Sequence, residues 1–555
     1  MQVQPRLTAR QKPPARRGSI LVIVLVVVAL LALGAYTFSQ KMIIESEATN
    51  MYGRQVQTRA MADSGVELVS ALLGDSLDPR DIGLYHDRGQ FQGIEVLAND
   101  NPALSGRFSV VAPIEADLEF RQIRFGLIDE SARINLNAIL SLELDTADFE
   151  LDTIIDDGGE DGGEDLDRPL ELAQREVLMG LPGMTEEIAD CILDWLDDDD
   201  DIREFGAEFE YYEGIGASYP PRNGPIVSLD ELLKIKGIDS WLLYGEDANR
   251  NGLLDPNEDD GEARPPFDDS DGILAVGWNS LLSTNAREIN LRADGDEKLN
   301  VNQDLLTELY DALVEEFDEE TARFVVAYRM YGSTDDPETG DWPVPVPEPE
   351  DPVTRGELNL ARGYRREIRS VYELIGITVT ATEEGESGGQ MFTYESPWSG
   401  EPGTMTGYLP DLIDTLSVSD DPYIDGRINV NQARREVLLG VPGMTEELAE
   451  EIMMARAVDS KTGEPPEDLQ EQRATSGWLV TEGLVELETM RILDPFLTSR
   501  GAVFRMQVIG HFDAGGPFTR IEAVIDATGE LPKVIFVRDL TELGKGYSYQ
   551  LLIPN

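Results

Sequence analysis

The clearest chemical pattern in the sequence is a twelve-residue stretch, DANRNGLLDPNE, at positions 247–258. Oxygen-bearing side chains alternate along it, Gly252 permits a sharp turn, and a glutamate closes it. This is the spacing of an EF-hand calcium loop, in which oxygens converge on a hard cation and the final Glu binds through both of its oxygens. The alternative is a solvated turn rich in Asp and Asn. Because every position is filled, we expect calcium in a lone loop, with these ligands: Asp247, Asn249, Asn251, the backbone carbonyl of Leu253, Asp255 and Glu258.

A second acidic segment, DWLDDDDDIREFGAEFEYYE, covers residues 194–213. Asp194 and the run 197–201 are followed by Glu208 and Glu210. Adjacent carboxylates repel one another unless water or a cation neutralises them. The residues alone therefore leave two interpretations open, a plain charged loop and a second cation site.

Other kinds of chemistry find little support in the composition. His86 and His511 are the only histidines and Cys191 is the only cysteine, which argues against a His-based triad, a multi-His zinc site and an internal disulfide. Paired carboxylates could act as in glycosidases, but acidic residues are so abundant that finding a pair indicates nothing. The formal charge of −62 would repel nucleic acid. We expect neither catalytic activity nor nucleic-acid binding.

The N-terminus carries a basic leader before an apolar stretch. An uncharged run extends from Gly18 to Gln40, and as a helix it would be roughly 33 Å long, enough to cross a hydrocarbon core of roughly 30 Å. The positive-inside rule places the leader in the cytoplasm and the body outside it. A signal anchor or a cleaved secretory signal is the alternative. Arg17-Gly18-Ser19 instead resembles a prepilin peptidase site, cleaved between Gly18 and Ser19.

The elements that must position these residues form an α+β protein. We predict a leader at 1–18, a transmembrane helix at 19–40 and a stalk helix at 41–75. Alternating strands near the stalk and at the C-terminus predict one pilin-like α/β sheet. Its first part covers 76–140, a mostly helical insertion follows at 141–498, and 499–555 complete the domain.

The predicted insertion contains a repeat. REVLMGLPGMTEEIAD at 175–190 recurs as REVLLGVPGMTEELAE at 435–450, and both copies suggest helix-hairpin-helix units at about 170–240 and 425–495. Such units commonly bind DNA through amides at a helix N-terminus. Here glutamates directly follow each turn, where they cap the helix dipole and would repel phosphate. We expect the units to serve packing or protein contact.

Together these features resemble the general secretion pathway protein K family, the large minor pseudopilins of type II secretion systems. The resemblance rests on the RG-S leader and on several segments spread over most of the chain. These are LIDESARINLNAI (127–139), ILDWLDDDDDIREFGAEFEYYE (192–213), YPPRNGPIVSLDELLKIKGI (219–238), RINVNQARREVLLGVPGM (427–444) and FLTSRGAVFRMQVIGHF (496–512).

The resemblance implies a pilin-like domain interrupted by a helical domain that binds calcium, with Asp197, Asp199, Asp201 and Glu208 as a second site. It also implies processing by prepilin peptidase, a single inner-membrane span, a periplasmic body, and assembly at the pseudopilus tip with other minor pseudopilins. Ile23 stands at the fifth mature position, where major pilins and most pseudopilins carry Glu. That Glu pairs with the N-terminal amine of a neighbouring subunit, and a tip subunit need not make this pairing. The alternatives are a competence-type DNA receptor and a pilus-independent calcium-binding surface protein.

Overall fold

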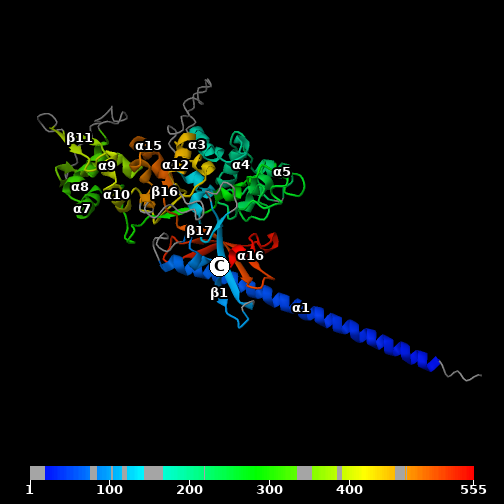
Figure 1. The fold of residues 1–555 in the computed structure, drawn as a ribbon. Helices are drawn as coiled ribbons and strands as arrows, with labels where there is room; N and C mark the ends of the chain where they lie inside the picture. The colour runs from blue at the N-terminus through cyan, green and yellow to red at the C-terminus, as the bar shows by residue number, and fades with distance from the viewer. Residues whose placement is uncertain are drawn as a thin grey trace, which may run out of the picture.

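The computed structural model describes residues 19–75, 84–101, 104–114, 122–142, 167–217, 219–333, 353–383, 390–456, 469 and 472–554. A long helix projects from a body that has a sheet beside the helix and a larger, mostly helical region beyond the sheet (Figure 1). The mixture of helices and sheet confirms the predicted α+β class. The predicted leader, residues 1–18, lies outside the described residues.

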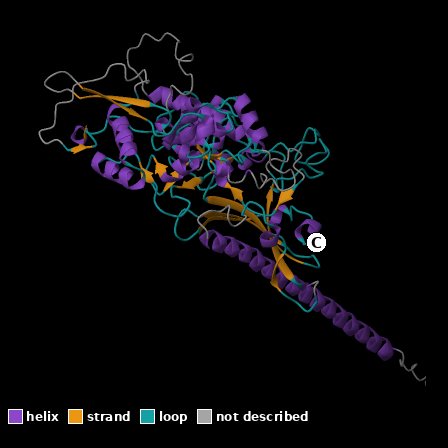
Figure 2. Cartoon of the chain, turned by 60° about the vertical axis from the view of Figure 1, so that its left-hand side comes forward, coloured by secondary structure: helices purple, strands orange, loops and turns teal. Residues whose placement is uncertain are grey.

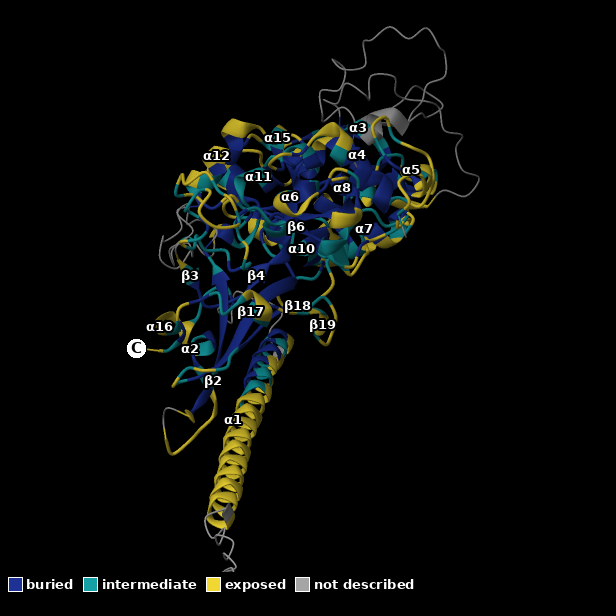
Figure 3. Ribbon diagram, turned by 90° about the vertical axis from the view of Figure 1, so that its right-hand side faces the viewer, coloured by how far each residue is buried: buried dark blue, intermediate teal, exposed yellow. Residues whose placement is uncertain are grey.

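The long helix, α1 (Ser19–Asp75), has two halves of different character. Its N-terminal half is exposed, whereas its C-terminal half is partly buried against the sheet (Figure 3). The buried residues Ala62, Val66 and Val69 recur at helical spacing and face the sheet. The exposed half reaches a mean hydropathy of 2.9, and by length and composition this helix could span a membrane. The structure thus contains a candidate membrane anchor that continues directly into the body.

The main sheet joins segments from both ends of the chain. Its central order is β1-β2-β17-β18-β19, all antiparallel, with β3 beside β2 and β4 beside β17. The strands are β1 (Ile94–Leu97), β2 (Gly106–Pro113), β3 (Ile123–Arg124), β4 (Ile128–Asp129), β17 (Val503–Phe512), β18 (Thr519–Asp526) and β19 (Lys533–Asp539). β2 pairs with β17 from Gly106↔Phe512 to Val111↔Gln507, so the expected single sheet is present.

The two faces of this sheet differ in chemistry. Phe504, Met506 and Val508 of β17 belong to the core formed with α1. The alternate residues Arg505 and Gln507 lie on the opposite face, since side chains alternate along a strand. Helix and sheet approach closely: a Cβ on Gly510 would lie 2.1 Å from the Thr58 carbonyl oxygen. Only glycine permits that contact.

The helical region consists of short elements around a separate large core, visible as the cluster of helices in Figure 2. Its helices are α3 (Asp167–Met179), α4 (Glu186–Leu196), α5 (Phe209–Gly214), α6 (Ser240–Tyr244), α7 (Leu306–Glu316), α8 (Glu319–Tyr331), α9 (Pro402–Met405), α10 (Leu409–Thr415), α11 (Arg435–Leu438), α12 (Glu446–Ala455), α14 (Trp478–Thr481) and α15 (Leu487–Leu493). Short helices α2 (Arg88–Phe91) and α16 (Tyr549–Leu552) lie beside the sheet (Figure 3).

Two-stranded pairs connect these helices. They are β5 (Ile134–Asn135) with β6 (Leu282–Ser283), β7 (Arg287–Ile289) with β14 (Tyr423–Asp425), β8 (Leu299–Asn300) with β13 (Leu416–Ser417), β9 (Thr354–Arg355) with β10 (Leu358–Asn359), β11 (Thr378–Glu383) with β12 (Gln390–Glu395), and β15 (Ile428–Asn429) with β16 (Leu497–Thr498). The pairs that contain β5, β8 and β15 are parallel.

Those three parallel pairs mark a structural repeat. Each first strand belongs to an Asn-x-Asn sequence, and the second Asn of each, Asn137, Asn302 or Asn431, donates from Nδ2 to two backbone carbonyls. The paired carbonyls come from distant segments, so each amide closes a unit of the helical region. Two of these Asn-x-Asn sequences lie in segments quoted above for the family resemblance, 127–139 and 427–444, whereas the copy around Asn302 lies in none of them and was missed.

The predicted sequence repeat folds twice as a helix, a Pro-Gly turn and a second helix. Gly183 and Gly443 have φ of 70° and 77°, a region that favours glycine. Thr185 and Thr445 accept hydrogen bonds at the N-termini of α4 and α12. The copies contact each other, because a Cβ on Gly440 would lie 2.5 Å from the Val177 carbonyl oxygen. Their assignment to the helix-hairpin-helix class stays a prediction.

Candidate cation sites

The 247–258 loop follows α6 and turns sharply around Asp247. The Oδ1 atom of Asp247 accepts from the Asn251 amide at 3.0 Å, and its Oδ2 accepts from the Gly252 amide at 2.8 Å. Gly252 has a φ of 69°, which places it in the left-handed region that such a turn requires. The first predicted ligand therefore folds the chain back over itself. No helix of EF-hand length begins directly after Glu258, in agreement with a lone loop.

The other predicted side chains meet inside this turn. Asp255 Oδ2 accepts from Asn249 Nδ2 at 2.6 Å and from Asn251 Nδ2 at 2.9 Å. Glu258 accepts from the backbone amides of Ala248 and Asp255 through its two different carboxylate oxygens, both at 3.0 Å. The structure thus brings the predicted side-chain ligands into one group.

Two observations show that this group fits a hard cation. Asn249 Oδ1 is buried and has no hydrogen-bond partner among the described residues. The oxygen and nitrogen of an Asn amide have nearly the same shape, so rotating the Asn249 amide by about 180° would present its oxygen beside Asp255. Glu258 is 1% exposed, and burial together with the nearby Asp247 and Asp255 raises its pKa to about 7. A divalent cation would offset that crowding of negative charge.

Leu253 has a second role besides the carbonyl ligand predicted for it. Its side chain packs against the core of the sheet, and its amide donates to Asn251 Oδ1 at 2.7 Å. The loop is therefore bound to the sheet as well as folded on itself.

The second candidate site lies where α4 ends and α5 begins. Asp197 follows the last residue of α4 and Glu208 precedes the first residue of α5. Arg203 binds Asp194 at 2.9 Å and also binds Asp197. Asn223 reaches the same place and donates to Asp200 Oδ1 at 3.1 Å. We call Asp194, Asp197, Asp200, Glu208 and Asn223 the acidic cluster.

The acidic cluster contains buried oxygens without hydrogen-bond partners, which a bound cation could coordinate. Both carboxylate oxygens of Glu208, which is 2% exposed, are buried and lack a partner in the described part of the chain. The same holds for Asp197 Oδ1 and Asn223 Oδ1. Burial, followed by the charges of Asp194, Asp197 and Asp200, raises the pKa of Glu208 to about 8. Unpaired buried oxygens are costly, and a bound cation would satisfy them.

The predicted ligand set of this second site is only partly gathered. Glu208 is buried and Asp197 is half-buried, whereas Asp199 and Asp201 are exposed, as is Asp200 of the acidic cluster. Asp199 Oδ1 accepts from the Asp201 amide at 2.8 Å, which makes a local turn. Asn223 was missed as a member of this site. The sequence signal that could have found it is the Asn-Gly pair at 223–224, which is typical of a turn, and the φ of 47° at Asn223 is unusual for a residue other than glycine.

Neither site rests on carboxylates alone. Among the described residues, no three His, Cys, Asp or Glu side chains form a group that could hold a metal ion. Amide oxygens and backbone carbonyls must therefore contribute, as they do for calcium in proteins.

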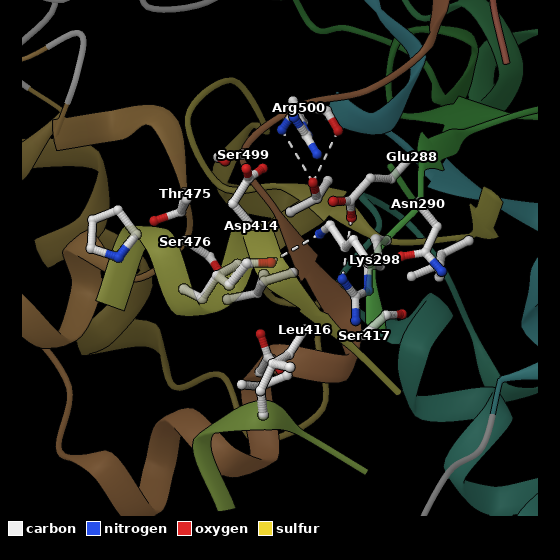
Figure 4. A pocket seen from close by; sticks show the side chains of 18 of the residues that line it. Glu288, Asn290, Lys298, Asp414, Leu416, Ser417, Thr475, Ser476, Ser499 and Arg500 are labelled. Carbon is white, nitrogen blue, oxygen red and sulfur yellow. Dashed lines mark hydrogen bonds and ion pairs between the residues drawn. The ribbon is translucent and has the colours of Figure 1, made fainter. Parts of the chain in front are cut away.

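A separate cavity of about 240 Å³ lies between the second and third repeats (Figure 4). Its walls carry both signs of charge. Arg427 pairs with Glu288 at 3.2 Å, and Lys298 donates to the Ile413 carbonyl at 3.0 Å. Because these charges bind one another and the backbone, the cavity lacks the gathered oxygens of the two cation sites.

Comparison with known proteins gives one family match. Residues 132–243, which include the acidic cluster, match the model described as type II secretion system (T2SS), protein K. No curated protein sequence matches the chain.

Among solved structures, a chain of the GspK-GspI-GspJ complex of the enterotoxigenic Escherichia coli Type 2 Secretion System is 10% identical. The alignment covers 89% of this chain and 99% of that one, with a TM-score of 0.35. Through residues 132–243, the chain is similar to the type II secretion system protein K family.

Proposed function

We propose that the protein is a minor pseudopilin that acts at the tip of the periplasmic pseudopilus, in its assembly and in protein export. The proposal places α1 in the inner membrane and the body in the periplasm. It is supported most directly by the arrangement in Figure 1: the apolar end of α1 projects from one side of the sheet, and the helical region lies on the side away from it.

That arrangement suits the end of a filament better than its interior. Pilin-like subunits stack through their long helices, so each shaft subunit must leave room for the subunit above it. Here the large helical region lies beyond the sheet in the direction away from the apolar end of α1. Ile23 adds a second argument, because a subunit without an intramembrane carboxylate has no charge there that requires a partner.

The proposed partners are other minor pseudopilins. Calcium is the proposed cofactor, held by the 247–258 loop and by the acidic cluster, where it would neutralise carboxylates and order the backbone. The DNA-receptor alternative gains no support from the two Pro-Gly turns. Glu186 and Glu187 begin α4, and Glu446 and Glu447 begin α12, so each helix N-terminus already carries negative charge.

Processing provides the test. In cells with an active prepilin peptidase, mass spectrometry of the membrane-bound protein should find Ser19 at the N-terminus, and the protein should co-purify with other pilin-like subunits. Gly18→Val should retain the leader. Gly34→Val is the matched control, since Gly34 lies inside α1 with nothing within 4 Å of an added Cβ. Retention of the leader in the wild-type protein would exclude the pilin-like interpretation.

A further inference from the structure

We propose that Arg520, Gln507 and Tyr547 hold the 247–258 loop in its cation-binding shape, so that calcium bound in the loop fastens the helical region to the sheet. The inference rests on the calcium site of the proposed function. It adds three positioning residues and the attachment of the helical region to the sheet by calcium. Neither follows from the spacing of the loop.

The three residues bind consecutive carbonyls of the loop. Arg520 of β18 donates from Nη2 to the carbonyls of Asn249 at 2.8 Å and Arg250 at 2.5 Å. Gln507 of β17 donates to the Arg250 carbonyl at 2.7 Å. Tyr547, in the segment before α16, donates to the Asn251 carbonyl at 3.0 Å. Sheet and C-terminal segment therefore hold the first half of the loop from outside.

The residues whose carbonyls bind the sheet side include two of the predicted calcium ligands. Asn249 and Asn251 direct their side chains toward Asp255 inside the loop, while their carbonyls bind the sheet side. In an EF-hand loop the backbone ligand comes from the seventh position, which is Leu253 here. The carbonyls of the third to fifth positions are therefore free to bind outward without removing a ligand.

Arg250 shows that the held conformation needs support. Its φ is 59°, in the left-handed region that residues with a Cβ rarely adopt. Such a conformation persists only when the surroundings determine it. The surroundings here are the two donors on the Arg250 carbonyl, from Gln507 and Arg520.

Arg520 is a firm support because it is fully buried. Its side chain is 0% exposed, and its Nε donates to Gln507 Oε1 at 3.0 Å. The Tyr547 hydroxyl lies 2.9 Å from the same Gln507 Oε1 and shares its one proton between this oxygen and the Asn251 carbonyl, so the three positioning residues form one network. Moving the loop away would leave Nη2 of the buried Arg520 without the acceptors that it has in the loop, which is costly.

Further contacts close the junction. Asn251 Nδ2 donates to the Gly546 carbonyl at 2.6 Å. A Cβ on Gly252 would lie 3.0 Å from Pro113, the last residue of β2. The loop thus contacts β2, β17, β18 and the C-terminal segment, although in the sequence it lies between α6 and the second repeat.

Thermodynamic linkage gives the consequence. If the positioning residues favour the cation-binding shape, they raise the calcium affinity of the loop. By reciprocity, calcium must then favour the attachment of the loop to the sheet by the same factor.

The test uses the full chain in detergent, with calcium titrated by calorimetry. Tyr547→Phe removes one hydroxyl and should weaken binding at the loop about five-fold. Tyr549→Phe is the matched control, because its hydroxyl accepts from the Gly515 amide and is not bonded to the loop. Arg520→Lys keeps the charge but loses the planar guanidinium with its several N–H donors, and should weaken calcium binding at the loop at least about ten-fold. If Arg520→Lys does not fold, Tyr547→Phe still tests whether the positioning residues raise the calcium affinity of the loop.

Hydrogen exchange supplies a readout that a general loss of stability would not reproduce. Calcium should slow amide exchange in residues 540–552 of the wild type and of Tyr549→Phe, but not in the double variant Asp247→Ala with Glu258→Gln. Unchanged affinity in folded Tyr547→Phe and Arg520→Lys, or protection confined to 247–258, would overturn the inference and leave the calcium site standing. Failure of the calcium site itself would be seen separately, as no saturable loop binding in the wild type.

Discussion

Two of the places where the helical region is attached to the sheet use the same strands in different ways. One is the 247–258 loop, which binds Gln507 and Arg520. The other, which we call the buried ion network, consists of Asp129, Glu130, Arg505, Glu522 and the residues they bind. Both use the face of β17 and β18 that points away from α1.

In the buried ion network, Arg505 pairs with two of the three carboxylates. Arg505 binds Glu130 through two nitrogens at 2.7 and 3.0 Å, and binds Glu522 at 3.0 Å. Burial alone would raise the pKa of Glu130, but Arg505 and Arg133 hold it below its usual range. Asp129 Oδ2 accepts from Asn429 Nδ2 at 2.7 Å, which ties the third repeat to the same place.

The loop, in contrast, gathers Asp247, Asp255 and Glu258 with no cationic side chain bound to them, and Asn249 Oδ1 lacks a hydrogen-bond partner among the described residues. The difference teaches that one attachment is held by ion pairs within the chain, whereas the other should depend on the calcium concentration.

The largest expected effect comes from breaking the buried ion network. Glu130→Gln leaves Arg505 with Glu522 as its one carboxylate partner, and should lower the free energy of unfolding by about 3–5 kcal/mol, because removing one partner of a buried ion pair is costly. Denaturant unfolding of the full chain in detergent would measure it. Glu95→Gln, which breaks a half-exposed pair with Arg107, should cost less than about 1 kcal/mol. The comparison fails if added calcium restores the stability of Glu130→Gln.

Sequence patterns predicted the sheet but not what covers it. The alternation in AVFRMQVIGHF predicted a strand with one apolar and one polar face, which is correct for β17. Such a polar face normally meets water, yet Arg505 is 7% exposed and Arg520 is 0% exposed. The covering loop lies 257 positions away from Gln507 in the sequence, and no local pattern reports a contact of that range.

The candidate sites show the same limit. The spacing of the 247–258 loop singled out side chains that the structure places close together, because all of them lie within one short turn. Their role as calcium ligands stays a prediction. The acidic cluster instead depends on Asn223, which lies in a different segment from Glu208. In a run of five adjacent aspartates, spacing cannot distinguish Asp200 from Asp199. The repeat around Asn302 was missed because α7 and α8 are joined without a Pro-Gly turn.

An intermediate effect concerns a third group on the same face of β17. His511 is 1% exposed, its ring meets Tyr549 edge-on, and Lys545, Asp513 and Arg107 surround it. Burial, with Lys545 and Arg107, lowers its pKa to about 4. The unfolded chain therefore binds a proton at higher pH than the folded chain, and stability falls as the pH drops from about 6.5 toward 4.

We expect this single group to remove about 2 kcal/mol of stability between pH 7.5 and pH 5. Other groups titrate in the same range, so the quantity to measure is the difference in pH dependence between the wild type and His511→Leu. The leucine variant should lose less stability on acidification, with or without calcium. Equal slopes would show that His511 is not buried in its neutral form.

The smallest effect on the sheet should come from the acidic cluster. Its side chains lie between α4 and α5 and bind no strand of the main sheet in the described structure. At pH 7 with a chelator, Glu208 is mostly protonated because its pKa is about 8, and Gln reproduces that shape. Glu208→Gln should therefore change unfolding by less than about 0.5 kcal/mol in chelator, yet remove one calcium equivalent from the titration. Asp201→Asn changes an exposed neighbour and should bind calcium as the wild type does.

Hydrogen exchange then tests whether the two sites are independent. In Glu208→Gln, calcium should still slow amide exchange in residues 540–552, since that protection belongs to the 247–258 loop. Loss of the protection would show that the acidic cluster and the loop are coupled.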